Sequence, residues 1–86
     1  MSRDELIKKM CEDAYTLTCL RGKYSKKKED AIWNKCTDWN SENPDQEIFM
    51  CEKYSDVKPN TCIGFYIEDD YFIFPEFKDP FERGEI

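Results

Sequence analysis

The side chains with the most reactive chemistry in this chain are its five cysteines, in a total of 86 residues. They are Cys11, Cys19, Cys36, Cys51 and Cys62, so no Cys-x-x-Cys pair is present, and the chain contains no histidine. Zinc sites are built from closely spaced cysteines and histidines, and cysteine nucleophiles are normally activated by an imidazole. The pattern therefore predicts neither a structural zinc ion nor cysteine catalysis.

The oxidation state of these cysteines is a second question. Their number is odd, so at least one thiol would stay unpaired in a monomer. The N-terminal segment lacks the apolar run of about 7–15 residues that a secretory signal needs. We therefore expect a cytoplasmic protein whose reduced cysteines pack as small hydrophobic residues. The alternative is a redox-sensitive or disulfide-linked small protein.

Carboxylates are the other groups that could carry out chemistry. Without histidine, acid–base catalysis would need a carboxylate or lysine with a strongly shifted pKa. The three glycines, Gly22, Gly64 and Gly84, are isolated, so no phosphate-binding loop is present. Asp69 and Asp70 lack the ligand spacing of a calcium-binding loop. We expect a protein with no enzymatic activity, no cofactor and no metal site.

Charge divides unevenly along the chain. Residues 1–40 carry nine Lys and Arg against seven Asp and Glu, a balance of +2. Residues 41–86 carry four against twelve, a balance of −8, which gives the net charge of −6 for the whole chain. The acidic half also contains all six phenylalanines. Charge steers encounter between proteins and aromatic side chains supply contact energy, so this half is typical of an interaction surface.

The acidic and aromatic residues near the C-terminus are accordingly the predicted contact with a partner. This predicted set consists of Glu68, Asp69, Asp70, Tyr71, Phe77 and Phe81. The partner expected is a larger protein with a basic surface, which the chain would mask or regulate as an inhibitor or adaptor. The amino-acid usage, rich in Lys, Asn, Ile, Phe and Tyr, indicates an AT-rich genome. That usage and the small size fit a phage-encoded factor that acts in the host cytoplasm.

A basic segment supports an alternative function. It consists of Arg21, Lys23, Lys26, Lys27 and Lys28 around Tyr24. Clustered cations can hold phosphates and a tyrosine can stack on a base, so nucleic-acid binding, of RNA above all, is the second hypothesis. Against it, the net charge repels polyanions. Weak self-association between this basic segment and the acidic half is a third possibility, and the oligomeric state is left open.

Apolar spacing in the first half of the chain predicts helices. Ser2 and Glu5 form a capping box before a helix over residues 3–21, whose apolar positions recur at three- and four-residue steps. Ser25 can cap a second helix, which ends in the polar run at residues 40–43. Asn43 followed by Pro44 resembles another helix start, so a third short helix is expected over residues 44–54.

The pattern changes after residue 60. Two runs rich in aromatic and β-branched residues, 61–67 and 71–74, flank the acidic turn Glu68-Asp69-Asp70 and predict a β-hairpin. The face carrying Ile63, Phe65 and Ile67 is the expected core face, because a lone hairpin needs helices packed on it. The fold class is therefore α+β: three short helices, then a hairpin packed on them. Residues 1–75 form the domain and residues 76–86 an acidic, aromatic tail. No apolar stretch reaches the roughly 20 residues of a membrane span.

Overall fold

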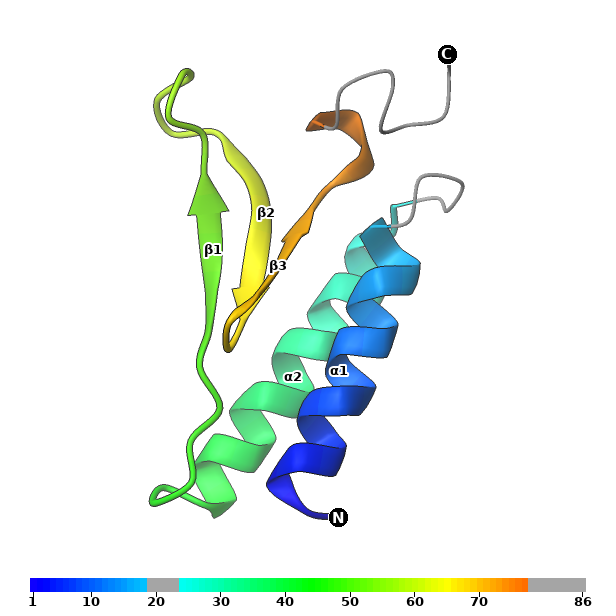
Figure 1. The fold of residues 1–86 in the computed structure, drawn as a ribbon, viewed down its shortest axis with the longest axis vertical. Helices are drawn as coiled ribbons and strands as arrows, with labels where there is room; N and C mark the ends of the chain where they lie inside the picture. The colour runs from blue at the N-terminus through cyan, green and yellow to red at the C-terminus, as the bar shows by residue number, and fades with distance from the viewer. Residues whose placement is uncertain (19–23, 78–86) are drawn as a thin grey trace.

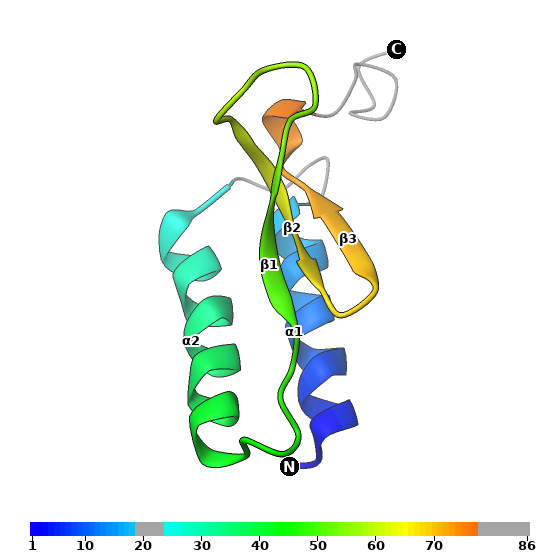
Figure 2. The same ribbon diagram turned by 90° about the vertical axis from the view of Figure 1, so that its left-hand side faces the viewer.

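Two helices and a three-stranded antiparallel sheet follow one another in the computed structural model, which describes residues 1–18 and 24–77 (Figure 1). The elements are α1 (Arg3–Thr18), α2 (Lys26–Glu42), β1 (Met50–Tyr54), β2 (Cys62–Ile67), β3 (Asp70–Ile73) and the 3-10 turn η1 (Pro75–Phe77). The strands are ordered β1-β2-β3. The helices lie side by side on one face of the sheet, and neither α1 nor α2 covers the other face (Figure 2). The α+β class is confirmed.

Helix α1 begins at the predicted cap. The Glu5 amide donates to Ser2 Oγ at 3.2 Å, which satisfies one of the free N–H groups of the first turn. The expected apolar stripe is buried, with Met10 and Ala14 at 0% exposure. It packs on α2 and on strands β2 and β3. The last expected turn, residues 19–21, and the capping Gly22 lie outside the described residues.

Ser25 is the N-cap of helix α2, as expected, and its side chain accepts from the Lys28 amide. Three lysines in the first turn oppose the helix dipole. Lys26 is balanced by ion pairs with Glu29 and with Asp30, the latter at 2.9 Å. The side chain of Glu29 is itself almost buried, at 7% exposure. The acidic groups one turn along the helix therefore relieve part of this unfavourable start.

The third helix predicted over residues 44–54 is wrong. Asn43 is the C-cap of α2, and its backbone N–H donates to the Trp39 carbonyl. Pro44 and Asp45 form a turn, and Met50–Tyr54 is strand β1. The same Asn-Pro pair that can begin a helix also ends the preceding one, because the ring of proline disfavours helical backbone in the residue before it. Here it ends α2.

The sheet is built around β2, the central strand. Phe65 pairs with Glu52 of β1 and with Phe72 of β3. Phe65 and Ile67 are fully buried against the helices, as expected, but Cys62 packs on the core in place of Ile63, because the register shifts where Lys53 and Tyr54 pair with Gly64 and Cys62. The hairpin between β2 and β3 turns at Glu68, whose φ of 54° lies in the left-handed region that costs a non-glycine residue about 1–2 kcal/mol.

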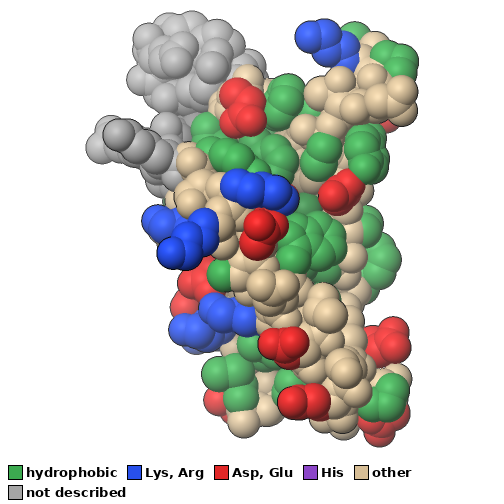
Figure 3. All heavy atoms as spheres, turned by 180° about the vertical axis from the view of Figure 1, so that it is seen from behind, with side chains coloured by type: hydrophobic (Ala, Val, Ile, Leu, Met, Phe, Trp, Pro, Cys, Tyr) green, Lys and Arg blue, Asp and Glu red, His purple; other side chains and the backbone are tan. Residues whose placement is uncertain are grey.

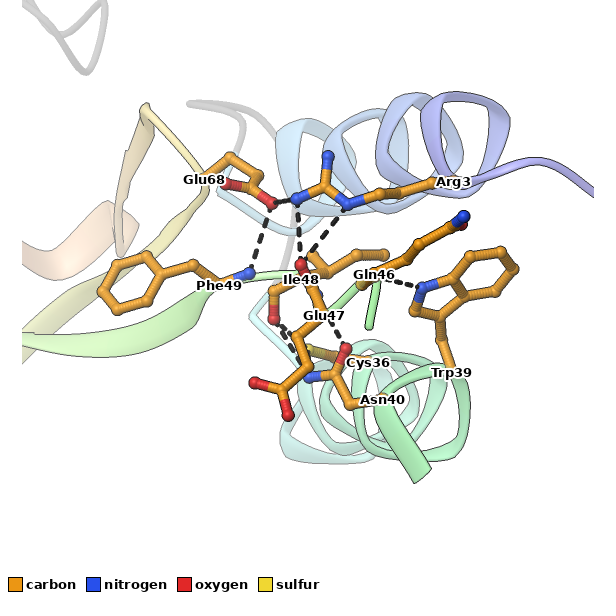
Figure 4. A network of polar contacts seen from close by, with 9 residues as sticks. All are labelled: Arg3, Cys36, Trp39, Asn40, Gln46, Glu47, Ile48, Phe49 and Glu68. Carbon is orange, nitrogen blue, oxygen red and sulfur yellow. Dashed lines mark hydrogen bonds and ion pairs between the residues drawn. The ribbon is translucent and has the colours of Figure 1, made fainter. Parts of the chain in front are cut away.

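A polar network fixes the chain where it crosses from α2 to the sheet (Figure 4). The Asn40 side chain accepts from the Ile48 amide at 2.7 Å and donates to the Ile48 carbonyl at 3.0 Å. From α1, Arg3 donates to the Glu47 carbonyl at 2.9 Å and pairs with Glu68. Both helices therefore hold the segment just before β1, and Ile48 is buried at 2% exposure.

We expect Asn40→Ala to destabilise the fold by about 2 kcal/mol, because both backbone groups of Ile48 lose their amide partner in a partly buried place. The measurement is the midpoint of urea unfolding. Asn34→Ala is the matched control, since Asn34 is exposed on the same helix. Equal midpoints for the two variants would show that the Asn40 contacts do not stabilise the fold.

Gly64 allows β2 and β3 to approach closely. A Cβ atom at this position would lie 2.1 Å from the Phe72 carbonyl oxygen, a backbone atom that moves only if β3 moves. We expect Gly64→Ala to destabilise the protein by about 1–3 kcal/mol in thermal unfolding, as overpacked sites do. Cys62→Ala, two residues earlier on the same strand, is the control and should cost less. An unchanged melting temperature for Gly64→Ala would contradict the close packing of these strands.

Candidate protein-binding surface

The face of the sheet turned away from the helices is formed by strands of the acidic half and is turned toward the viewer in Figure 2. We call it the open face. Strand residues alternate between the two faces, and Phe65 and Ile67 point to the helices, so their neighbours on β2 point outward. The register then places Cys51, Lys53, Tyr66, Tyr71 and Ile73 on the open face.

Two tyrosines form the centre of this surface. Tyr66 and Tyr71 are directly paired across β2 and β3, and their rings stack at 5.0 Å with 25° between planes. Tyr71 is 42% exposed. Partial burial raises the pKa of Tyr71, and nearby Asp56 adds to this while Lys53 opposes it. The Tyr71 phenol therefore keeps its proton at neutral pH, as a hydrogen-bond donor beside an apolar ring.

Phe49 extends the aromatic area at the end of the sheet nearest the β2–β3 turn. Its ring points away from both helices (Figure 4) and is 57% exposed. Its backbone is fixed on both sides, since the amide donates to Glu68 Oε1 at 3.3 Å and the carbonyl accepts from the Glu68 amide at 2.7 Å. An exposed aromatic side chain on a fixed backbone is the kind of group that anchors protein contacts.

The three predicted carboxylates of the acidic turn have different environments. Glu68 forms the ion pair with Arg3 of α1. Asp70 accepts from the thiol of Cys11 at 3.3 Å. Asp69 is exposed, and no contact of its side chain is found among the described residues. Of the turn, Asp69 is therefore the carboxylate presented to solvent without an internal partner, whereas Glu68 and Asp70 contribute to the fold.

The remaining predicted contacts lie beyond β3. Phe77, in η1, is 42% exposed, and Glu76 beside it is also exposed. Phe81 lies outside the described residues, as does most of the expected tail at 76–86. Tyr71, Asp69 and Phe77 are thus accessible, on the sheet and just after it.

Internal contacts engage part of the alternative basic segment. Tyr24 packs its ring edge-on against Phe74 at 5.0 Å, and its hydroxyl donates to Glu29. Burial and the contact with Glu29 both raise the pKa of Tyr24. Lys26 is ion-paired, while Lys27 and Lys28 are exposed. Figure 3 shows lysines over the N-terminal half of α2 with acidic side chains among them. Arg21 and Lys23 lie outside the described residues.

Four cysteines belong to the described residues, Cys11, Cys36, Cys51 and Cys62, and all four are free thiols. Burial raises the pKa of Cys36 and of Cys62. Burial and the carboxylate of Asp70 together raise the pKa of Cys11 to about 11. Since the thiolate is the reactive form, these environments make the three thiols slow nucleophiles at neutral pH.

Phe49 and Tyr66 are not in the contact set predicted from the sequence. Phe49 lies in the segment 44–54 that the sequence predicts to be a helix. The side on which its ring lies was therefore derived from a helical period, whereas a strand has a period of two residues. The continuous apolar run at residues 48–51 is compatible with a strand as well as with a helix, so its pattern alone could not identify β1. Alternation along β2 places Tyr66 on the face opposite Phe65, and the register then identifies Tyr71 as its partner on β3.

No group of three or more Cys, Asp or Glu among residues 1–18 and 24–77 is arranged to hold a metal ion. Neither helix in that part of the chain is long and apolar enough to cross a membrane. Comparison of the chain with protein-family models, with curated proteins and with solved structures finds no match.

We expect Asp70→Asn to lower the pKa of Cys11, because the thiolate would no longer face a carboxylate within hydrogen-bond distance. The pH dependence of Cys11 alkylation by iodoacetamide, followed by peptide mass spectrometry, measures this. In the unchanged protein the rate should still be rising near pH 11, and the curve of the variant should lie at lower pH. Asp69→Asn is the control with an exposed carboxylate. Identical curves for Asp70→Asn and the unchanged protein would contradict the Cys11–Asp70 contact.

Proposed function

We propose that this chain is a small, non-enzymatic binding protein that engages a basic surface on a larger protein through its open face. The stacked pair Tyr66–Tyr71 is the observation that carries this proposal. Two large rings lie at 5.0 Å on a sheet face that neither helix covers, with Phe49 57% exposed at its end. Exposed, fixed aromatic side chains lose little conformational entropy on binding and supply much of the contact energy.

The charges around these rings favour a basic partner, and arginine in particular. Asp69 lies at the turn, and Asp56 is close enough to influence the Tyr71 pKa. An arginine guanidinium can stack on a tyrosine face while it donates to a neighbouring carboxylate. One patch would therefore contact both the flat face and the positive charge of a single arginine side chain. Such a protein would act as an inhibitor or adaptor in the cytoplasm.

Nucleic-acid binding by the basic segment has less support. Tyr24, the side chain expected to stack on bases, already uses its ring and its hydroxyl in contacts with Phe74 and Glu29. Lys26 is paired with carboxylates of its own helix. Lys27 and Lys28 are the exposed cations of the described part of this segment that form no ion pair within it, in a protein whose net charge is −6.

The partner can be found by affinity capture from a lysate at about 50 and 300 mM salt, with and without nuclease, because screening weakens contacts between exposed charges. We expect a protein that is retained after nuclease treatment and is recovered less well at the higher salt concentration. If nuclease treatment abolishes recovery, the proposal is contradicted and nucleic-acid binding by the basic segment is favoured.

Once the partner is identified, Tyr71→Ala should speed dissociation of the complex by at least about tenfold. That factor corresponds to a loss of roughly 1.4 kcal/mol of contact energy. Asp69→Lys should instead slow association and reduce its dependence on salt. Surface plasmon resonance measures both rates. Tyr54→Ala and Asp45→Lys are the matched controls, an exposed tyrosine and an exposed aspartate outside the stacked pair and the turn. Rates that change no more than in these controls would exclude the open face as the contact.

A further inference from the structure

A second surface lies on the opposite side of β3, where the strand meets α1. The residues of β3 alternate, so Tyr71 points to the open face while Phe72 points toward the helices. Between α1 and β3 lies a groove of about 770 Å³, lined on its apolar side by Ile7, Cys11, Tyr15 and Phe72. Ile7, Cys11 and Phe72 are half-buried, and Tyr15 is 68% exposed. We call this the α1–β3 groove.

The α1 side of the groove has the geometry of a helix-packing surface. Its lining residues recur at three- and four-residue steps from Asp4 to Thr16, so they form one stripe along three turns of α1. This stripe is about 18 Å long at the rise of an α-helix. It adjoins the buried stripe of Met10 and Ala14, which faces α2 and the sheet, and Ile7 and Cys11 pack partly against the same core. Helix α1 therefore carries a partly covered apolar strip beside its buried one, with Tyr15 as the most exposed ring.

The edges of the groove are acidic. Asp4, Glu12 and Asp70 line it together with a single lysine, Lys8. The carboxylate of Asp70 is directed to the Cys11 thiol, which places a negative charge beside the apolar floor. An occupant must therefore bring apolar side chains on one face and positive charge on its flanks.

We propose that the α1–β3 groove binds an amphipathic, cationic α-helix of a partner protein. A helix with apolar residues at i, i+3, i+4 and i+7 matches the stripe on α1, and lysines or arginines on its flanks meet the acidic edges. This site is distinct from the open face and does not rest on the function proposed above. It would allow the protein to hold two segments at once, one on each side of β3.

The probe is a synthetic peptide of about 14 residues with leucines at i, i+3, i+4 and i+7 and lysines on both sides of that stripe. Its control is a scrambled peptide of the same composition, which has the same charge and no apolar stripe. Titration into the isotopically labelled protein, followed by two-dimensional NMR, should give saturable shifts at Ile7, Cys11, Tyr15 and Phe72. The affinity should fall as salt is added.

The double variant Tyr15→Ser/Glu12→Lys should weaken binding of this peptide by at least about tenfold. Both side chains are exposed, so the fold should be kept. The control pair Tyr54→Ser/Glu42→Lys makes the same exchanges outside the groove and should leave the affinity unchanged.

Three results would overturn the proposal. If the scrambled peptide binds equally well, attraction between charges alone accounts for the binding. Shifts confined to the open face, at Tyr66 and Tyr71, would place the peptide on the other surface. Shifts of the groove residues on dilution of the protein without peptide would identify a second copy of the chain as the occupant.

Discussion

The position of the sheet depends on how the chain leaves α2 and enters β1. A segment at this point has no neighbouring strand to satisfy its backbone groups, and burying them unpaired is costly. The side chain of Asn40 replaces that strand by accepting from and donating to Ile48, while Arg3 binds the Glu47 carbonyl. Ile48 can therefore enter the core, and β1 starts in the register that pairs Met50 with Ile67. The same register pairs Cys51 with Tyr66 and Glu52 with Phe65 along β1 and β2.

Both proposed binding surfaces are consequences of the alternation along β3. Four residues, Asp70–Ile73, supply a carboxylate and Phe72 to the helix side and Tyr71 and Ile73 to the open side. A one-residue slip of this strand would exchange the two sets. Gly64 and the turn at Glu68 oppose such a slip, the first by close packing against β3 and the second by its contacts with Arg3 and Phe49. The same contacts that stabilise the fold therefore fix what each surface displays.

The sequence was sufficient where local signals agreed with one another. Caps at Ser2 and Ser25, apolar spacing in both helices, and the two runs of β-branched and aromatic residues predicted α1, α2 and the β2–β3 hairpin. It misled at residues 44–54, because Asn43-Pro44 is compatible with the end of one helix as well as the start of another. What decided between them is non-local: the pairing of β1 with β2 and the Asn40 contacts eight residues away. Because Phe49 lies in this segment, the same error left it out of the predicted contact surface.

Counting charges along the chain overstated the acidity offered to a partner by the turn. Of its three carboxylates, Glu68 neutralises Arg3 and Asp70 faces the Cys11 thiol, so Asp69 is the one displayed without an internal contact in the described structure. The exposed aromatic area is larger than the sequence predicted, through Phe49 and the Tyr66–Tyr71 stack. Contact energy at the open face should therefore come mainly from ring burial, with charge governing the rate of encounter. At the α1–β3 groove the balance is different, because carboxylates border the apolar floor and an occupant must neutralise them as it binds.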